Sequence, residues 1–589
     1  MSERTSDSIA PVGLAALAVA GAVGGVAVVS KAIKSSPLGA ALSSVSPASA
    51  TRFLTQASFG ATDSSIADVQ AAGVQGWIAN QQALPITGSH LTYVQNRINS
   101  RTAKPNKATK ALLFNESFWR QAATAPDQLR QRVTLALSEI FVISILNAEL
   151  QDAITGAAAY YDMLTSNAFG NFRTLLEQVT LNPMMGVYLT YLANLPANTA
   201  TGRHPDENYA REVMQLMTIG LYKLNQDGTV QTNGSGKPIP TYSHDDIAGL
   251  AAVFTGFSWY SANPVNAGQF QTFYPKGGLL PVDPAASINP MIPYPVFHQT
   301  TSKSFLGVTI PASTTPDPVG DLKIVLDTLY NHPNVGPFIG SQLIQRLVTS
   351  NPSPAYVSRV AGIFNDDGTG VRGNLAAVVK AVLLDSEARD DTVATSATFG
   401  KLREPVIRLA NWVRAFNATS ASGFWLVPNT SNPGVLDQTP LTAPSVFNFF
   451  APGYTPPGTS TSAAGLVAPE FQVVNEISVA GYLNFMLSVV TAGLGTPPGG
   501  SKPLDVRTSY PKEVALANSP ADLVARLNLL LLNGQMSTAL QTQIVNVVTS
   551  VAVPASPPAT ATAVTAALTQ RVQLAVFMAL ASPEYIVQR

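Results

Sequence analysis

Apolar side chains recur along most of this chain with the spacing of an α-helix. The clearest case is 127–144, DQLRQRVTLALSEIFVIS, in which Leu129, Val133, Leu137 and Phe141 follow one another at intervals of four residues. The same period predicts helices at 151–165, 172–180, 207–219, 244–254, 318–330, 335–349, 355–364, 375–386, 405–415, 470–491, 520–532, 537–551 and 560–581. The pattern therefore predicts a mainly α fold.

Three long stretches lack this period. Residues 224–243 are rich in Gly, Asn and Thr and leave room for one small β-hairpin, while 259–316 and 417–468 are rich in Pro, Gly, Ser and Thr. Loops of that length are usually functional or disordered. Because each stretch contains aromatic residues that need burial, none resembles a domain linker. We expect a single large multi-helical domain over 51–589, with long Pro/Gly-rich loops.

The N-terminal segment predicts export. Residues 11–29 are apolar and uncharged, near the minimum length for spanning a bilayer and long for a signal-peptide core. We interpret 1–34 as a signal peptide or a membrane anchor and 35–50 as a Ser/Ala/Pro linker, in which Ala48-Ser49-Ala50 fits a cleavage pattern. The body is expected to be extracytoplasmic (periplasmic, surface-bound or secreted), with N-terminal membrane contact through 11–29 if the segment is retained.

Composition excludes several functional classes. Only 12% of the 589 residues are charged, about half the usual ~25%, and Lys plus Arg equals Asp plus Glu at 35 each. Without a basic excess, we expect no nucleic-acid partner. The chain has no cysteine, which excludes disulfides, thiolate catalysis and Cys-ligated zinc. A neutral polar surface of this kind is typical of extracytoplasmic proteins.

One segment concentrates charge in this otherwise uncharged chain. In 203–212, RHPDENYARE, five of the ten residues are ionised. Its Pro and acidic residues suit the start of a helix. On that helix Glu207 and Arg211 share a face and can pair, Asn208 and Glu212 share the next face, and Tyr209 belongs to the apolar seam.

This cluster has two interpretations. If it borders a cavity, Glu207 and Glu212 are acid/base candidates and Arg211 holds an anion or carboxylate. If it is structural, it belongs to a buried ion-pair network between helices. Charged residues that could complete such a network occur on two other predicted helices: Arg130, Arg132, Glu139, Arg403, Glu404 and Arg408.

The histidines add candidates without a metal-site pattern. His204 adjoins the acidic cluster, and His298 lies in an irregular stretch. His244 begins a helix at which Ser243 is the predicted N-cap and Asp246 fills the first turn. No HExxH or similar spacing occurs, so we predict no metal, and the sequence identifies no cofactor.

Other motifs carry little chemistry. NQDGT at 225–229 and NDDGTG at 365–370 resemble fragments of calcium loops, but both lack the Glu at the twelfth position and are predicted to be Asx/Gly turns. The chain contains no Gly-x-Ser-x-Gly elbow, P-loop or dinucleotide fingerprint.

Ordered blocks throughout the body resemble one family. The blocks include RFLTQASFG at 52–60, LRQRVTLALSEIFVIS at 129–144, FGNFRTLLEQVTLNPMMGVYL at 169–189, PDENYAREVMQLMTIGLYKLNQDGT at 205–229, DDIAGLAAVFTGFSW at 245–259, HPNVGPFIGSQLIQRLVTSNPSPAYVSRVA at 332–361, GKLREPVIRLANW at 400–412, PSVFNFFAPGYTPPG at 444–458 and SPEYIVQR at 582–589. The chain resembles the bacterial family known as domain of unknown function 1800, from about Thr51 to Arg589.

The resemblance implies export but no established reaction. Members often occur beside a second family that resembles alkaline phosphatases and sulfatases, which suggests a partner. The family's most distinctive motif corresponds to 207–212, ENYARE. The chain departs from the common pattern at Met217, where many members have an aromatic or His, and at Gln299, where an Asp usually follows the residue matching His298. The second departure weakens a His–Asp pair there.

We expect an extracytoplasmic hydrolase or lyase that acts on an extracellular polymer such as a polysaccharide. Two carboxylates on one helix are not placed independently across a bond, so Asp246 is an alternative second group. The candidate catalytic residues are Glu207, Glu212, Asp246 and His204. The candidate substrate-binding residues are Arg211, Asn208, Tyr209, Trp259 and His298, with His204 also able to hold substrate. The aromatic candidates for stacking are Trp259, Tyr260, Trp425 and Tyr454.

Two further hypotheses remain open. The chain could be a non-enzymatic envelope scaffold, or the partner of a neighbouring secreted phosphatase- or sulfatase-like protein, with its Pro-rich loops as docking surfaces. It could also bind a phosphate or sulfate ester between Arg211 and Arg403.

Overall fold

The computed structural model describes residues 45–100, 107–261, 270, 284–497, 500, 502–555 and 558–589. The predicted leader 11–29 and most of the predicted linker 35–50 lie outside these residues. Helix α2 (Pro47–Ala57) begins within the predicted linker, with Ser46 as its N-cap. Since Ala50 is fully buried, the folded body begins about four residues before the expected boundary at 51, and the Ala48-Ser49-Ala50 pattern lies inside a helix.

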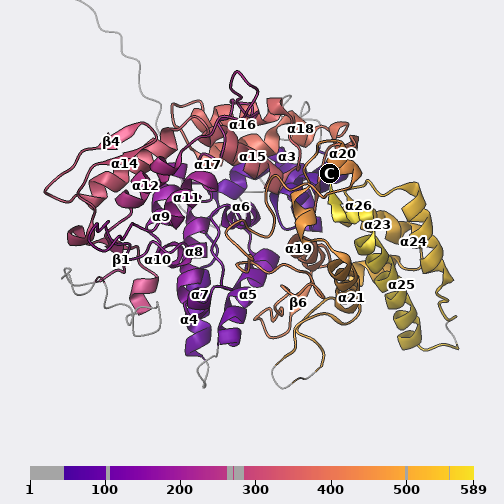
Figure 1. Cartoon of the computed structure of the whole chain (residues 1–589). Coiled ribbons are helices and arrows are strands. Elements are labelled where there is room, and N and C mark those ends of the chain that lie inside the picture. Colours follow the sequence, from indigo (N-terminus) through magenta and orange to yellow (C-terminus); the bar gives the residue numbers. More distant parts are fainter. Residues whose placement is uncertain are drawn as a thin grey trace, which may run out of the picture. The chain divides into compact units, whose positions relative to one another are not determined.

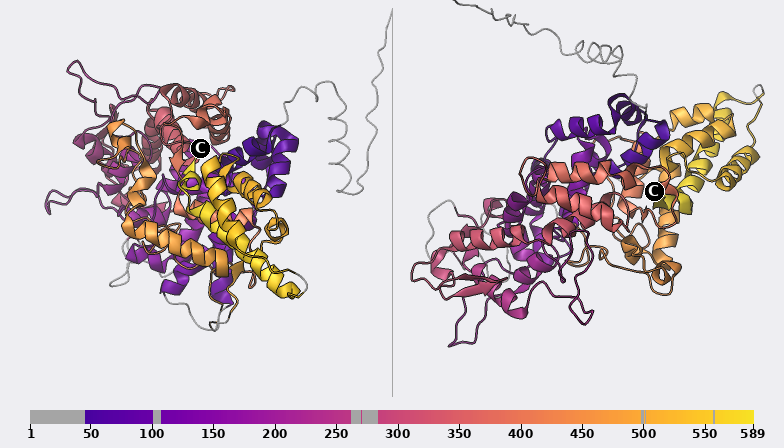
Figure 2. Two further views of the ribbon diagram at one scale, coloured as in Figure 1. Left: turned by 90° about the vertical axis from the view of Figure 1, so that its right-hand side faces the viewer. Right: turned by 90° about the horizontal axis from the view of Figure 1, so that it is seen from above.

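The chain from Ser46 to Arg589 forms one compact, mainly helical unit (Figures 1 and 2). The helices of its first half are α3 (Asp63–Ala83), α4 (His90–Asn99), α5 (Lys107–Thr124), α6 (Gln128–Ser138), α7 (Ala148–Asp152), α8 (Ile154–Asn167), α9 (Phe172–Thr180), α10 (Pro183–Tyr188), α11 (Asn208–Gln215), α12 (His244–Val253), η1 (Pro284–Ser287) and η2 (Pro295–Phe297).

The second half is built in the same way. Its helices are α14 (Pro318–Asn331), α15 (Val335–Leu347), α16 (Pro354–Asn365), α17 (Leu375–Leu384), α18 (Ser386–Arg389), η3 (Val393–Thr395), α19 (Pro405–Ala415), α20 (Ser460–Ala463), η4 (Pro469–Val473), α21 (Glu476–Ala492), α22 (Pro511–Leu516), α23 (Pro520–Leu532), α24 (Thr538–Ser550), α25 (Ala561–Ala581) and α26 (Pro583–Ile586). Figure 1 shows α23, α24 and α25 gathered at one side, where they contact one another.

Local sequence signals explain where many helices begin. Side-chain oxygens of N-cap residues accept backbone N–H groups at Thr62, Ser89, Asn171, Ser243, Ser353, Asn475, Ser537 and Thr560. Proline occupies the first turn of α2, α10, α14, α16, α19, α22, α23 and α26. Both features satisfy or remove N–H groups that lack a partner within the helix.

Three predicted helices end or divide differently. Helix α6 stops at Ser138. The segment that follows is not helical, and its Ile145 N–H donates to the Leu441 carbonyl at 2.8 Å. Helix α11 stops at Gln215, and the N–H groups of Ile219 and Gly220 both bond back to Met214. The predicted helix 470–491 is divided into η4 and α21. In the first case a tertiary hydrogen bond overrides local propensity, and in the second the helix is closed locally at Gly220, whose φ is 70°.

Four small antiparallel sheets occur in the described structure; β3–β4 is a local hairpin, and the other three join segments farther apart along the chain. The pairs are β1 (Phe257–Ser258) with β2 (Ile292–Pro293), β3 (Lys303–Phe305) with β4 (Val308–Ile310), β5 (Lys401–Leu402) with β8 (Val587–Gln588), and β6 (Thr419–Ser420) with β7 (Val506–Arg507). The stretch 224–243, where a hairpin was expected, holds isolated bridges such as Leu224 to Val230 and Thr232 to Pro238. The mainly α prediction is confirmed, with more β-pairing than the single hairpin expected.

Among the described residues, α25 alone is long and apolar enough to cross a bilayer by length and composition. It contacts α21, α23 and α24, and Val572, Val576 and Leu580 are fully buried. Packing against these helices accounts for the apolar residues on the buried side of α25.

Candidate functional site

The predicted charge cluster lies where α11 and α12 begin. Arg211 Nη2 is 3.4 Å from Glu207 Oε2, and His244 Nδ1 is 3.9 Å from the same oxygen. Glu207 occupies the N-cap position of α11, and His244 is the first residue of α12. The expected Glu207–Arg211 pair is confirmed. It is a surface group, since the Arg211 and His244 side chains are 43% and 74% exposed.

Glu212 lies on the buried side of the same helix. The residue is 6% exposed, and its Oε2 has no hydrogen-bond partner among the described residues. Burial raises the pKa of this carboxyl, and the charge of Arg211 offsets the effect only in part. No ion pair joins Glu212 to a cation within the described part of the chain. A buried carboxyl in this state favours its neutral, proton-donating form.

Tyr242 is a site residue that the sequence did not reveal. Burial, together with the nearby charge of Glu212, raises the pKa of its phenol. Its hydroxyl donates to Gln215 Oε1 at 3.3 Å, which ties the segment before α12 to the end of α11. Because Tyr242 falls within the irregular stretch 224–243, helical periodicity could not place it beside Glu212.

Asp246 has a structural role. Its Oδ2 accepts the backbone N–H and the hydroxyl of Ser243, completing the capping box of α12, and its Oδ1 accepts the Leu306 N–H at 2.6 Å. Partial burial opposes ionisation, but these hydrogen bonds lower the pKa of the carboxyl. Oδ2 caps α12 and Oδ1 holds the β3–β4 turn against it, so Asp246 is a poor choice for the second catalytic group.

The remaining candidate site residues near this cluster differ in how deeply they are buried. His204 and Asn208 are exposed. Tyr209 and Trp259 are fully buried, and the Tyr209 ring stacks on Tyr191 with centroids 4.0 Å apart. The predictions that Tyr209 binds substrate and that Trp259 stacks on it are wrong for this structure, because neither ring presents a face to solvent. Trp425, at 6% exposure, is excluded for the same reason.

His298 forms a His–Asp pair with Asp321, although the residue that follows it is Gln299 and not Asp. Its Nε2 lies 2.9 Å from Oδ2 of Asp321 on α14, and its Nδ1 lies 2.8 Å from the Thr255 carbonyl. Lys303 Nζ contacts the same Asp321 oxygen at 2.6 Å. The expectation of a weakened pair was therefore wrong. Both ring nitrogens are in contact with protein groups, and the buried position of the ring suits a packing role rather than the expected substrate binding.

The other charged residues form a network of their own. Lys401 Nζ lies 2.9 Å from Glu470 and 3.6 Å from Glu404, and Arg346 Nε lies 3.5 Å from Glu139. Each of these side chains is at most 4% exposed. The structural interpretation expected this network to include Glu207 and Glu212. It forms without them, around α6, α15 and α19.

Two buried carboxyls in this network, Glu139 and Glu404, have pKa values displaced in opposite directions. Burial, and then the adjacent charge of Glu404, raises the pKa of Glu139 well above its usual range, despite the contact with Arg346. Burial also opposes ionisation of Glu404, but the charge of Lys401 and a hydrogen bond from the Gln438 amide lower its pKa to about 2. We therefore assign the proton to Glu139 and the charge to Glu404.

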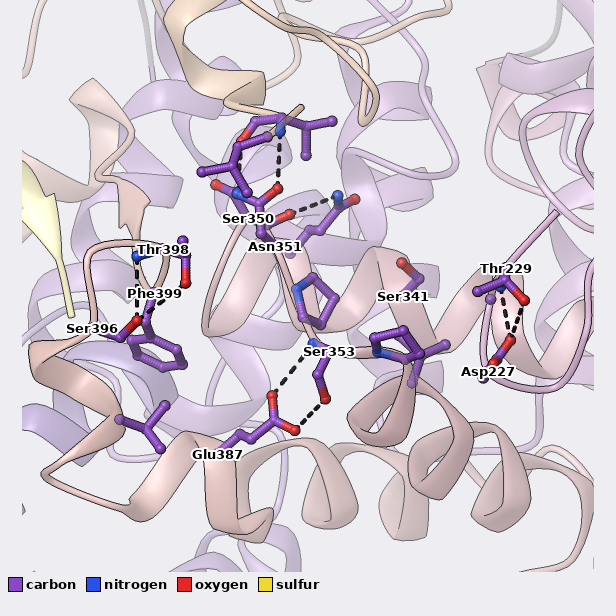
Figure 3. A pocket seen from close by; sticks show the side chains of 18 residues that line it. Asp227, Thr229, Ser341, Ser350, Asn351, Ser353, Glu387, Ser396, Thr398 and Phe399 are labelled. Carbon is purple, nitrogen blue, oxygen red and sulfur yellow. Dashed lines mark hydrogen bonds between the residues drawn. The ribbon is translucent and has the colours of Figure 1, made fainter. Parts of the chain in front are cut away.

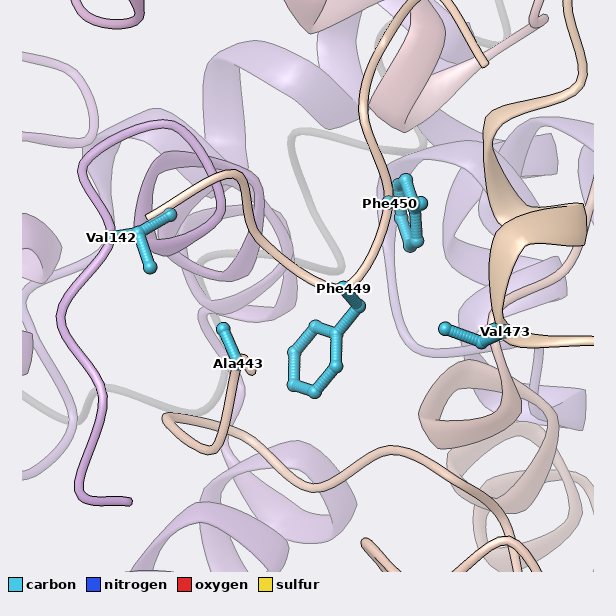
Figure 4. Packing of buried hydrophobic residues seen from close by; sticks show 5 residues of the cluster. All are labelled: Val142, Ala443, Phe449, Phe450 and Val473. Carbon is cyan, nitrogen blue, oxygen red and sulfur yellow. The ribbon is translucent and has the colours of Figure 1, made fainter. Parts of the chain in front are cut away.

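A small cavity adjoins Glu139. Its volume is about 10 Å³, room for one water, and its lining includes Ser138, Gln438 and Asn448. The same loop contributes Phe449 and Ala443 to a cluster of apolar side chains, and Figure 4 shows these packed with residues of two other segments, Val142 and Val473. No substrate of polymer size can reach Glu139 through this packing.

A larger cavity of about 560 Å³ lies beside α15 and α16 (Figure 3). Its lining is mostly neutral, and its one glutamate, Glu387, is engaged by the Ser353 hydroxyl and N–H and by Arg359. Asp227 accepts the N–H and hydroxyl of Thr229 at its edge, so NQDGT forms the Asx turn predicted for it. The acidic side chains that line this cavity, Asp227 and Glu387, both have hydrogen-bond partners within the protein.

The comparisons with known proteins place the chain in one family. A family model described as protein of unknown function (DUF1800) matches residues 52–587. Nothing matches the chain among curated proteins or among solved structures. The family match covers nearly all of the compact unit from Ser46 to Arg589, including both the Glu207–Glu212 helix and the buried charge network. The chain thus belongs to the DUF1800 family of proteins of unknown function.

Proposed function

We propose that this protein is an extracytoplasmic hydrolase or lyase that acts on an extracellular polymer such as a polysaccharide, with Glu212 as its general acid. The observation that carries the proposal is the burial of Glu212 without a counter-ion in the described structure. An unpaired buried carboxyl destabilises a fold and is characteristic of sites where a pKa is adjusted for proton transfer.

The neighbouring groups supply complementary roles. Glu207, paired with Arg211 and close to His244, would act as base. Tyr242, whose hydroxyl donates to Gln215 at the end of the same helix, would border the site. One buried and one surface carboxyl differ in environment, as acid/base cleavage of a glycosidic bond requires of its two groups.

Turnover by the purified full chain on a panel of neutral and acidic polysaccharides tests the proposal. New reducing ends without an unsaturated product indicate a hydrolase, and ultraviolet absorbance of an unsaturated uronate indicates a lyase. Glu212→Gln should lower turnover by about 100- to 10,000-fold, the usual contribution of a positioned acid. Its melting temperature should be unchanged or higher, because the substitution removes a group that burial disfavours.

The chain offers a matched control for Glu207→Gln. Glu177 forms the same i,i+4 pair with Arg173 on α9 and is half exposed. Glu177→Gln should leave turnover unchanged, whereas Glu207→Gln should reduce it. The proposal fails if the wild-type chain degrades no polymer of the panel, or if Glu212→Gln keeps wild-type activity.

A specific surface feature favours the alternative of an envelope scaffold. Large apolar side chains are 39–64% exposed around η4 and the start of α21: Phe447, Phe471, Ile477 and Val479. Phe447 and Phe471 belong to segments that pack together beneath the surface. A scaffold role predicts that this protein and the neighbouring phosphatase- or sulfatase-like protein form a complex, which sedimentation of the purified pair would detect. Phe447→Ser should weaken that complex, and sedimentation of separate species would exclude it.

A further inference from the structure

A second cavity, remote in sequence from the Glu207 cluster, lies between α4, α5 and the loop 420–426. Its volume is about 580 Å³, within the range of small-molecule sites. Its lining combines two aromatic rings, two guanidinium groups and neutral polar side chains, with no carboxylate among them: Thr87, Ser89, Thr92, Tyr93, Asn96, Arg97, Ser100, Ser117, Arg120, Gln121, Thr124 and Phe424.

Phe424 presents an aromatic surface at this cavity. Its side chain is 39% exposed, and the Arg97 guanidinium lies 3.7 Å from the ring centroid. Arg97 covers one face of the ring, so the exposed surface belongs to the opposite face and the edge. Arg97 is itself held by two hydrogen bonds of 2.7 and 3.1 Å to the buried carboxylate of Glu116, which also accepts the Tyr93 hydroxyl at 3.0 Å.

The loop that carries Phe424 is fixed from the other side. Asp505 accepts the Ser422 N–H at 2.7 Å and the Leu426 N–H at 3.0 Å. Between them Trp425 has a left-handed backbone with φ of 56° and a buried ring. Such a conformation costs a non-glycine residue about 1–3 kcal/mol. The Trp425 ring is buried, and Phe424 beside it is left exposed.

The chemistry of the lining selects a ligand class. The apolar face of a pyranose ring packs on an aromatic face, and its hydroxyls bond to amide and hydroxyl side chains such as Asn96 and Gln121. Arg97 is neutralised by Glu116, but Arg120 has no ion pair among the described residues. A free guanidinium binds a carboxylate with two parallel hydrogen bonds.

We propose that this cavity binds an acidic saccharide, with a hexuronate ring stacked on Phe424 and its carboxylate held by Arg120. The site shares no residue with the Glu207–Glu212 cluster, so the inference does not depend on the proposed catalysis.

Calorimetric titration of the purified full chain tests the site. The probes are a hexamer of α-1,4-linked galacturonate and, as a neutral counterpart, cellohexaose. The galacturonate hexamer should bind at least tenfold more tightly than cellohexaose. Phe424→Ala should weaken binding of the acidic hexamer at least tenfold, and Arg120→Gln should remove the preference for it.

Exposed residues elsewhere provide the controls. Phe447→Ala and Arg203→Gln remove an exposed ring and an exposed guanidinium outside the cavity, and both should leave the affinity unchanged. The proposal is overturned if neither hexamer binds, if both bind equally, or if Arg120→Gln keeps its preference. Should Phe424→Ala fail to fold, Arg120→Gln still decides the question.

Discussion

Replacing each member of the buried Glu139–Glu404 pair by glutamine should have unequal effects on stability. Glutamine has the shape of glutamic acid and no charge, so it mimics the protonated form. If Glu139 holds the proton, Glu139→Gln changes little, because it replaces one neutral group by another of the same shape. Glu404→Gln instead removes one of the two carboxylates that Lys401 faces in the interior and leaves Glu470.

The contacts set the size of the difference. Lys401 Nζ and Glu404 Oε1 are 3.6 Å apart, which corresponds to about 5 kcal/mol at an effective dielectric constant of about 20. Loss of one partner from a buried pair typically costs about 3–5 kcal/mol. Because Glu470 still faces Lys401 at 2.9 Å, we expect Glu404→Gln to lower the free energy of unfolding by up to about 3–5 kcal/mol and Glu139→Gln to change it by about 1 kcal/mol or less.

Guanidinium unfolding at neutral pH, followed by circular dichroism, measures both variants. The pH dependence gives a second readout. Because the pKa of Glu139 is raised in the folded state, wild-type stability falls as pH increases from the usual glutamate range towards that raised value. Glu139→Gln should lack this decline. Equal destabilisation by the two substitutions, or an unchanged pH slope, would refute the assignment of the proton to Glu139.

Three other predictions concern the packing around α12 and α3. A Cβ at Gly249 would lie 1.8 Å from the Ser304 carbonyl, so Gly249→Ala should destabilise the protein by at least about 1–3 kcal/mol in denaturant unfolding. Gly76, helical with its nearest neighbouring atom at 3.4 Å, is the control, and Gly76→Ala should stabilise by up to about 1 kcal/mol. His298→Phe leaves Asp321 without one of its two donors and should cost about 3 kcal/mol by the same assay; an unchanged midpoint would contradict its packing role.

Local features of this protein could be read from its sequence. The ranges 172–180, 405–415 and 520–532 match α9, α19 and α23, and the Ser243–Asp246 cap and the Glu207–Arg211 pair were both expected. Each of these depends on residues within one or two helical turns of each other. Spacing along the chain is then equivalent to spacing in space.

Tertiary structure decided which charges are buried and what they face. Periodicity placed Glu212 on the helix, but only the packing of α11 against α12 left its Oε2 without a partner and brought Tyr242 near it. The partners of His298 and Glu139 come from segments far along the chain, and Phe424 is exposed because Asp505 holds its loop. Desolvation and ion pairing depend on three-dimensional distance, which a helical period does not specify beyond its own helix.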